Sequence, residues 1–228
     1  MQRNLPKTLL AWSSGKDSAW ALHMLQRQGV RVEALLTTLN ESVGRVAMHG
    51  VRRTLLEAQA ESLGIPLWQV PLPWPCSNGD YESRMATACR RAVENGFDSI
   101  VFGDLYLRDI REYRERQLAG TGLKPVFPLW EIPTTLLARD MIEAGLRARL
   151  SCVDSKQLDP SFAGREFDRA LLEELPESVD PCGENGEFHS FVYGGPMFRS
   201  PIAIENGEVQ DINGFVYADF LPCPASSL

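Results

Sequence analysis

The sequence has few of the residues from which proteins build metal cages and disulfide frameworks. Its 228 residues include five cysteines and three histidines, and no two cysteines form a Cys-x-x-Cys pair. Structural zinc sites and redox pairs use that close spacing, so both interpretations are weak here. A built-in metal centre is therefore not expected.

Two further absences concern location and partners. No apolar run approaches the roughly 20 residues that cross a bilayer, and the first residues lead into a short strand rather than a signal-peptide core. We therefore expect a soluble, cytoplasmic protein that binds no membrane. Lys and Arg number 23 against 30 Asp and Glu, a formal net charge of -7, which argues against a broad electrostatic contact with nucleic acid. A small substrate or a protein partner fits better.

The first half of the chain alternates between strand-like and helix-like segments. Strands are expected at residues 8–12, 32–37, 66–71 and 99–103, and helices at 17–28, 51–63 and 81–95. Strands separated by helices predict right-handed crossovers and an α/β fold with a doubly wound parallel sheet. Such sheets bind ligands at the carboxyl ends of their strands.

After residue 103 the alternation loosens. A charged helix is expected at 108–118, a proline-rich stretch at 124–130, a helix near 134–144, and a strand at 147–153 that extends the sheet. Hairpin signals follow at Gly194-Gly195-Pro196, Asn206-Gly207 and Asn213-Gly214. The sequence thus predicts a parallel-sheet domain at 1–125 and a smaller C-terminal α+β region with β-hairpins at 126–228. The second region is expected to pack on the first as one compact unit.

A loop with phosphate-binding chemistry joins the first predicted strand to the first helix. Residues 13–18 read Ser-Ser-Gly-Lys-Asp-Ser. The start of a helix presents unpaired N–H groups and the positive end of its dipole, so phosphate is a natural ligand there. Gly15 permits close backbone approach, while Ser13 and Ser18 supply hydroxyls. Lys16 offsets phosphate charge, and Asp17 suits a magnesium ion or its waters.

Two other interpretations of these six residues need to be considered. In one, Ser14 caps the helix and Asp17, three residues later, completes a capping box, which many helices without a ligand possess. The other is a Walker-type loop, which needs a glycine and a Ser or Thr where this chain has Leu10 and Asp17. The γ-phosphate chemistry of Walker loops is therefore not implied, whereas the capping alternative stays open.

The loop resembles the Ser-Gly-Gly-x-Asp-Ser signature of the PP-loop ATP pyrophosphatases, with Ser14 in place of the first glycine. This resemblance implies a Rossmann-like fold of the HUP type and cleavage of ATP between the α and β phosphates. Other segments are similar to one branch, the diphthine-ammonia ligase family and its bacterial relatives. They are residues 48–52 (Met-His-Gly-Val-Arg), 102–105 (Phe-Gly-Asp-Leu), 111–114 (Arg-Glu-Tyr-Arg), 127–130 (Phe-Pro-Leu-Trp) and 181–189 (Pro-Cys-Gly-Glu-Asn-Gly-Glu-Phe-His).

The family resemblance implies an enzyme that uses ATP and Mg²⁺, adenylates a carboxylate with release of pyrophosphate, and lets ammonia displace AMP to form an amide. The family's acceptor is diphthine, the modified histidine of elongation factor 2; in a bacterial host, which lacks that target, the carboxylate is not readable. No separate glutaminase domain fits within 228 residues, so free ammonium is the simpler nitrogen source. The irregular carboxyl-terminal element favours a homodimer.

Further candidates around the loop each have two interpretations. Thr37 is expected at the end of the second strand. There it either faces ribose or adenine, or it is an ordinary β-branched strand residue. Gly103 and Asp104 end the fourth strand and either let the nucleotide lie against the backbone or form a plain turn. His49 precedes a helix, which it caps, or it touches the nucleotide.

The charged helix at 108–118 offers an arginine cluster. Arginine forks match phosphate or an acidic substrate, but most of this charge is explained by self-pairing at i, i+4. The pairs are Arg108 with Glu112, Arg111 with Glu115, and Glu112 with Arg116. For Tyr113 and Arg114 the family resemblance favours a substrate-binding role.

Glu184, Glu187 and His189 form the last candidate group. Glu187 and His189 are two residues apart in a strand-like run, so they are expected to project from one face. Together with Glu184 they suit binding of ammonium, uptake of its proton and orientation of the acceptor. The alternative is an exposed hairpin edge with ordinary polar residues.

The leading hypothesis is an ATP-dependent amide ligase in which Lys16 and Asp17 act with the Glu184, Glu187 and His189 group. A second hypothesis is an RNA-modifying PP-loop ATPase, for which cysteine pairs or a basic RNA-binding domain would be expected. A third is a nucleotide-binding sensor without turnover. Such a sensor needs no acceptor group.

Overall fold

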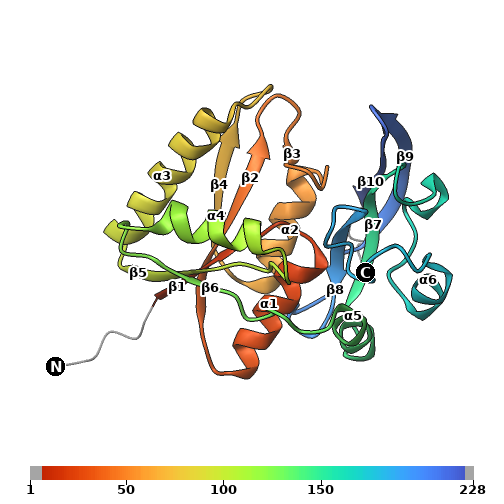
Figure 1. Ribbon diagram of the computed structural model, residues 1–228, viewed down its shortest axis with the longest axis horizontal. Coiled ribbons are helices and arrows are strands. Elements are labelled where there is room, and N and C mark those ends of the chain that lie inside the picture. Colours follow the sequence, from red (N-terminus) through yellow and green to blue (C-terminus); the bar gives the residue numbers. More distant parts are fainter. Residues whose placement is uncertain (1–6, 224–228) are drawn as a thin grey trace.

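Two separate β-sheets organise residues 7–223, which the computed structural model describes (Figure 1). The first sheet contains β1 (Lys7–Ala11), β2 (Val32–Asn40), β3 (Arg45–Val46), β4 (Leu67–Leu72), β5 (Phe97–Val101) and β6 (Lys124–Val126). The second contains β7 (Arg147–Asp154), β8 (Phe188–Gly194), β9 (Ile204–Ile212) and β10 (Phe215–Pro222). In the first sheet β1 lies between β2 and β5, β4 pairs with β2, and β6 pairs with β5, all in parallel; only the short β3 is antiparallel. The predicted doubly wound parallel sheet is thus confirmed.

Helices cover both faces of the parallel sheet. The helices are α1 (Lys16–Arg27), α2 (Arg53–Leu63), α3 (Asn78–Glu94), α4 (Arg108–Leu118), α5 (Thr134–Glu143), α6 (Arg169–Glu174) and a 3-10 turn (Pro160–Phe162). Apolar residues of α1, α2 and α5 share one core with the second sheet, whereas α3 and α4 pack on the opposite face. The face that carries α1 is therefore the one that meets the second sheet. Within residues 7–223, no helix combines the length and apolar character needed to cross a membrane.

One prediction was wrong: the strand expected at residues 147–153 does not extend the parallel sheet. The strand expected to extend the parallel sheet is β7, but it lies between β8 and β10 in an antiparallel sheet. A buried apolar strand carries no local signal of which sheet it joins, because that depends on distant partners. The parallel sheet ends instead at β6, inside the stretch expected to be merely proline-rich. Pro125 is tolerated there because β6 is an edge strand.

Of the predicted hairpin turns, only Asn213-Gly214 joins two strands. Both residues have positive φ (57° and 87°), as a tight turn between β9 and β10 requires. The other two predictions were wrong: Gly194 ends β8, and Asn206-Gly207 lies inside β9. Gly207 serves packing instead, because a Cβ there would lie 3.1 Å from the Cβ of Asp219.

Ion pairs reinforce the contact between the two sheets. Asp219 of β10 accepts a hydrogen bond of 2.8 Å from Arg45 of β3 and one of 3.0 Å from Nε of Arg52, which precedes α2. The predicted domain division at residue 125 falls within β6 and stays a prediction. Because the α1 core is shared by both sheets, the phosphate loop lies at their junction.

Candidate functional site

The loop between β1 and α1 leaves the start of its helix uncapped. Gly15 is the N-cap residue, in extended conformation (φ -92°, ψ 174°), and no side chain makes a capping hydrogen bond there. The capping-box alternative for Ser14 and Asp17 is therefore wrong; a true capping box occurs at α3, between Ser77 and Asp80. The Lys16 N–H donates to the Ser190 hydroxyl, whereas the N–H groups of Asp17 and Ser18 have no acceptor in another element among the described residues and remain available to an anion.

Ser14 has a left-handed backbone, with φ of 67°. This explains why the PP-loop signature has glycine at the position, since glycine adopts positive φ without a steric cost. Here a serine is held in that conformation by its surroundings. Its carbonyl oxygen accepts hydrogen bonds of 3.0 Å from the Val192 N–H of β8 and 3.0 Å from Nε2 of Gln59 of α2. The second sheet thus fixes the shape of the loop.

Lys16 points toward the second sheet. Its buried ammonium donates to the carbonyl of Cys182 and to both carboxylate oxygens of Asp17, at 3.0 and 2.9 Å, and it lies near the rings of Phe167 and Phe188. Burial lowers the pKa of Lys16, but the charge and hydrogen bond of Asp17, together with nearby Cys182 and Glu184, outweigh it and leave the pKa raised. Burial also raises the pKa of Asp17 above its usual range. In this arrangement Lys16 neutralises Asp17 rather than facing the open side of the loop.

Gly103 brings the end of β5 against the start of α1. A Cβ at this position would lie 2.9 Å from the carbonyl carbon of Asp17 and 2.9 Å from the Ser18 nitrogen. The space beside Gly103 is therefore filled by backbone of the phosphate loop. Thr37 is also used internally, because its hydroxyl donates to the Trp12 carbonyl at 2.7 Å. That contact fits the structural interpretation of Thr37.

Asp104 adds a second carboxylate at this edge of the sheet. Burial raises the pKa of Asp104 and the nearby Asp17 charge raises it further, although Arg114 opposes both. The Nε of Arg114 lies 3.6 Å from Oδ2 of Asp104, too far for a hydrogen bond, and both buried atoms lack a partner among the described residues. Carboxylate oxygens are the ligands that Mg²⁺ prefers, so Asp17 and Asp104 fit an ion brought by the nucleotide.

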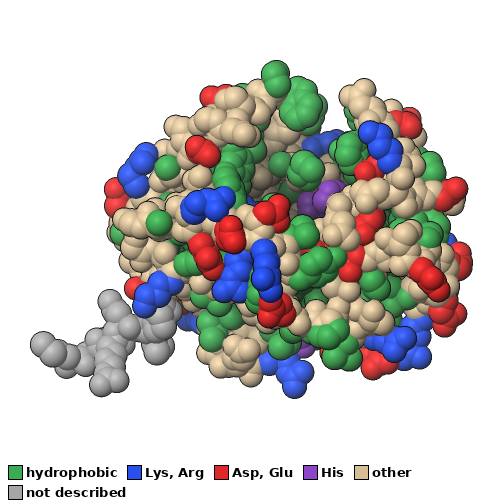
Figure 2. All heavy atoms as spheres, viewed as in Figure 1, with side chains coloured by type: hydrophobic (Ala, Val, Ile, Leu, Met, Phe, Trp, Pro, Cys, Tyr) green, Lys and Arg blue, Asp and Glu red, His purple; other side chains and the backbone are tan. Residues whose placement is uncertain are grey.

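His49 and His189 lie together against the loop. The Nδ1 atom of His49 is 2.9 Å from the Ser190 carbonyl oxygen, and its ring stacks on that of His189 with centroids 4.8 Å apart. His49 does not cap α2, whose N-cap is Arg52 without a side-chain cap. Burial lowers the pKa of His49 to about 4 and that of His189 to about 3. Histidine side chains are visible within the hollow between the two sheets (Figure 2).

The two glutamates of the candidate group occupy different positions. Glu184 accepts hydrogen bonds from the N–H groups of Leu105 and Tyr106, at 2.8 and 3.3 Å, and burial raises its pKa to about 7. Glu187 is 1% exposed, and one of its oxygens accepts from the Asp180 N–H at 2.9 Å. Its Oε2 has no partner among the described residues. Glu187 lies just before β8, so the strand alternation that was expected to align it with His189 does not apply.

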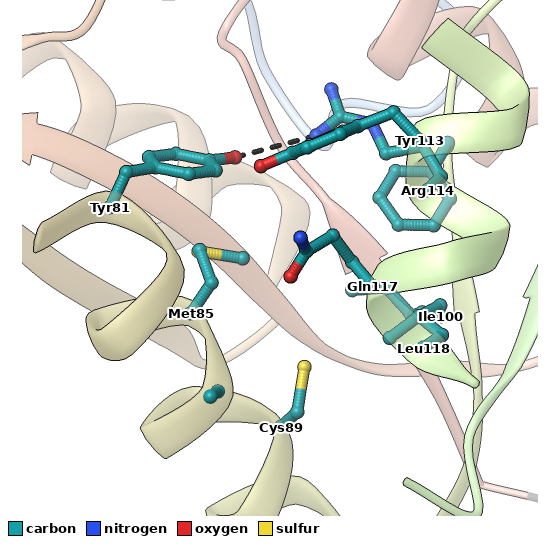
Figure 3. Close-up of a pocket in the computed structure, with 10 residues that line it drawn as sticks. Tyr81, Met85, Cys89, Ile100, Tyr113, Arg114, Gln117 and Leu118 are labelled. Atoms are coloured by element: carbon teal, nitrogen blue, oxygen red, sulfur yellow. Dashed lines mark hydrogen bonds between the residues drawn. The ribbon is translucent and has the colours of Figure 1, made fainter. Parts of the chain in front are cut away.

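Tyr113 and Arg114 lie in a different place from the rest of the group. They line a small slot between α3 and α4, on the face of the sheet opposite α1, with Tyr81 and Cys89 (Figure 3). The cavity volume is about 30 Å³, room for little more than a water molecule. Arg114 reaches the loop only through Asp104, whereas Tyr113 is remote from the second sheet.

The remaining arginines of α4 are satisfied at the surface. Arg111 pairs with Glu115 at 2.9 Å, and Arg116 lies 3.6 Å from Glu112. The expected pair of Arg108 with Glu112 is not formed, because Arg108 lies 3.8 Å from Glu131 instead. These exposed pairs agree with a solvated helix surface.

Gln59 and Ser190 contact the site but were not among the residues predicted from the sequence. Buried Gln59 accepts from Nε1 of Trp12 at 2.9 Å and donates to the Val192 carbonyl at 2.6 Å, so α2 is linked to β8 and to the residue that follows β1. The Ser190 hydroxyl accepts from the Lys16 N–H at 3.1 Å. Gln59 stands on the apolar face of α2, between Leu56 and Ala60; a polar residue on a buried face was the signal for it.

A parallel α/β sheet with a loop-to-helix start at its carboxyl edge that lacks a side-chain cap is the arrangement in which α/β proteins bind nucleotide phosphates, and the sequence of this loop resembles that of the PP-loop class. The comparisons refine this class. Residues 6–125 match the family model of the diphthamide synthase N-terminal domain, and residues 133–219 match that of the diphthamide synthase C-terminal domain. The chain belongs to this PP-loop family of diphthine–ammonia ligases.

Curated relatives agree along most of the chain. The diphthine–ammonia ligase of Danio rerio is 26% identical over 221 residues, which cover 86% of this chain and 85% of the relative. That of Mus musculus is 29% identical over 219 residues, covering 86% and 82%. The ligase of Schizosaccharomyces pombe is 25% identical over 89% of this chain, which spans only 37% of that longer protein.

Proposed function

We propose that this chain is an ATP-dependent amide ligase that adenylates a carboxylate, releases pyrophosphate, and lets ammonia displace AMP. The observation that carries the proposal is the start of α1, which has no side-chain cap and lies close to Glu184 and to the pair His49 and His189. A helix start suited to phosphate, close to acidic and imidazole side chains, supports an enzyme that brings two substrates together. The printed name of the relatives, diphthine–ammonia ligase, supports both the reaction and ammonia as the nitrogen donor.

The phosphate loop binds the leaving pyrophosphate. Its donors are the N–H groups of Asp17 and Ser18 in α1 and the hydroxyls of Ser13 and Ser18, whose oxygens lie 3.2 Å apart. A bound Mg²⁺ would supply positive charge for the phosphates and for the two partly exposed carboxylates Asp17 and Asp104. Gly103 keeps β5 close to these groups. The α phosphate then lies at the edge nearest the second sheet, where a carboxylate can reach it.

The second sheet and the segment before it bind the nitrogen donor and the acceptor. Glu187 offers a buried carboxylate oxygen without a protein partner, which suits an N–H donor such as ammonium. Glu184, in the loop at residues 183–186, and His189 of β8 supply further polar groups near Lys16. We propose a diphthine side chain as the acceptor, because the relatives are named diphthine–ammonia ligases. Its carboxylate must lie between Glu187 and the α phosphate.

A product assay tests this function. The purified protein is incubated with Mg-ATP, isotopically labelled ammonium, and either diphthine-bearing elongation factor 2 or a panel of small carboxylic acids. We expect AMP, pyrophosphate and labelled amide to form together, and none of the three products to form without the other two. ADP as the nucleotide product overturns the proposal. AMP formation that depends on added RNA would favour the RNA-modifying alternative, and nucleotide binding without turnover on every acceptor would favour the sensor.

A further inference from the structure

The tautomer of His49 follows from its hydrogen bond. A carbonyl oxygen can only accept, so Nδ1, which lies 2.9 Å from the Ser190 oxygen, carries the proton. In a neutral imidazole the other nitrogen, Nε2, is then an acceptor with a free lone pair. No hydrogen bond engages Nε2 within the described part of the chain. His49 therefore has one nitrogen fixed by β8 and one unused.

The unused nitrogen lies beside the phosphate loop. A Cβ at Gly15 would come within 2.6 Å of Cε1 of His49, the ring carbon between the two nitrogens, so the edge of the ring lies directly on the loop backbone. His189 stacks against the ring from β8, with an interplanar angle of 38°. Both side chains are only half-buried. Nε2, which is bonded to Cε1, thus lies beside the phosphate loop at Gly15.

The chemistry of Nε2 limits its ligand. Phosphate oxygens are acceptors, so an unprotonated Nε2 cannot hydrogen-bond the triphosphate; it needs an N–H or O–H donor. The positive charge of Lys16 disfavours protonation of His49 and of His189. An unprotonated Nε2 can accept a hydrogen bond from an N–H of neutral ammonia. A neutral base and a neutral nucleophile are therefore compatible beside the loop.

We infer that Nε2 of His49 takes a proton from ammonia as the nitrogen attacks the acyl-adenylate. The nitrogen lone pair forms the C–N bond, and the bond from the acyl carbon to the phosphate oxygen breaks with its electron pair on AMP. One N–H proton moves to Nε2, while Nδ1–H remains bonded to the Ser190 carbonyl. His189 is a positioning residue that holds the ring. This inference rests on the proposed function and concerns its second half-reaction.

The test separates the two half-reactions in His49→Asn, because the asparagine amide can keep the donor to Ser190 while removing the base. Adenylation is measured as acceptor-dependent exchange of labelled pyrophosphate into ATP, and amidation as labelled amide. We expect exchange to change by less than about threefold and amidation to fall about 100-fold, the lower range for loss of a general base. Hydroxylamine, a stronger nucleophile that is largely unprotonated at neutral pH, should restore acyl transfer to within about tenfold. His23→Asn is the matched control, since His23 only stacks on Trp20 within α1.

Each other outcome has a defined meaning. Equal loss of exchange and amidation, or a raised KM for ATP alone, overturns the inference and makes His49 a nucleotide ligand. Unchanged amidation shows that His49 is no base. If His49→Asn unfolds, His49→Gln is measured in the same way, with thermal melting as the check. A wild-type protein that forms no ammonium-dependent AMP overturns the proposed function itself.

Discussion

The two sheets contribute to the hollow in different ways. The parallel sheet presents mainly backbone: the start of α1, the left-handed Ser14, and Gly103 packed against the loop. The antiparallel sheet and the segment before it present side chains, among them His189 and Glu184. Backbone donors suit the phosphates common to all nucleotides, whereas side chains distinguish one acceptor from another. Substitutions on the two sides should therefore fail at different steps.

The largest effect is expected on the nucleotide side. Asp17→Asn should lower AMP formation at least about 1000-fold, a loss of about 4 kcal/mol of transition-state stabilisation, because the carboxylate that fits Mg²⁺ is gone. The amide can still accept from Lys16, so the fold should survive. AMP release is measured by chromatography, with a thermal melt alongside. Asp109→Asn at the exposed start of α4 is the control; similar AMP formation in both variants would remove Asp17 from the mechanism.

A second substitution tests the other side of the comparison. Glu187→Gln should leave pyrophosphate exchange nearly intact and lower amide formation about 100-fold, since it replaces the unpartnered Oε2 with an amide group that repels N–H donors. The carbonyl oxygen of glutamine can still accept from Asp180 and Asn185. Exchange and amidation are measured on the same preparation. Equal loss of both would show that Glu187 supports the fold or the nucleotide rather than the nitrogen donor.

The same division explains what the sequence could predict. The phosphate loop and the parallel sheet follow from local patterns, because a strand, a loop and a helix start are consecutive in the chain. The partners of His49 are not local: Ser190 is 141 positions away. Assignment of β7 to the wrong sheet has the same origin, since strand pairing depends on distant residues. Tyr113 was grouped with the acceptor residues by family resemblance alone, and the structure places it on the opposite face of the sheet.

Gly103→Ala tests the claim that the nucleotide side depends on backbone packing. The new methyl group would lie 2.9 Å from backbone atoms of Asp17 and Ser18, so the end of β5 or the start of α1 must shift. We expect a loss of about 2 kcal/mol in the free energy of unfolding, typical of overpacking, together with a raised KM for ATP. Gly79→Ala in α3 is the matched control, because only the Ser77 hydroxyl lies within 4 Å of its added Cβ. A Gly103 variant as stable as the control would contradict the packing argument.

The smallest effect concerns pH and Glu184. Burial raises the folded-state pKa of Glu184 to about 7, from an ordinary value of 4.5. Between these values the unfolded chain has already released the proton that the folded protein retains, so this group makes the free energy of unfolding fall as pH rises. The glutamine of Glu184→Gln does not titrate, so the variant lacks this dependence of the free energy of unfolding on pH. Its side-chain carbonyl can still accept a hydrogen bond from the Leu105 N–H.

Urea unfolding at about pH 5 and about pH 8 measures the difference between wild type and Glu184→Gln. The full shift would correspond to about 3 kcal/mol, which partial solvent access reduces to about 1 kcal/mol. We therefore expect the stability of the variant, relative to wild type, to increase by about 1 kcal/mol from the lower to the higher pH. Exposed Glu41→Gln should show no such change. If the free energies of unfolding of wild type and Glu184→Gln change in parallel with pH, Glu184 is as well hydrated as a surface carboxylate. The surroundings of Glu184 would then be more open to water than its burial implies.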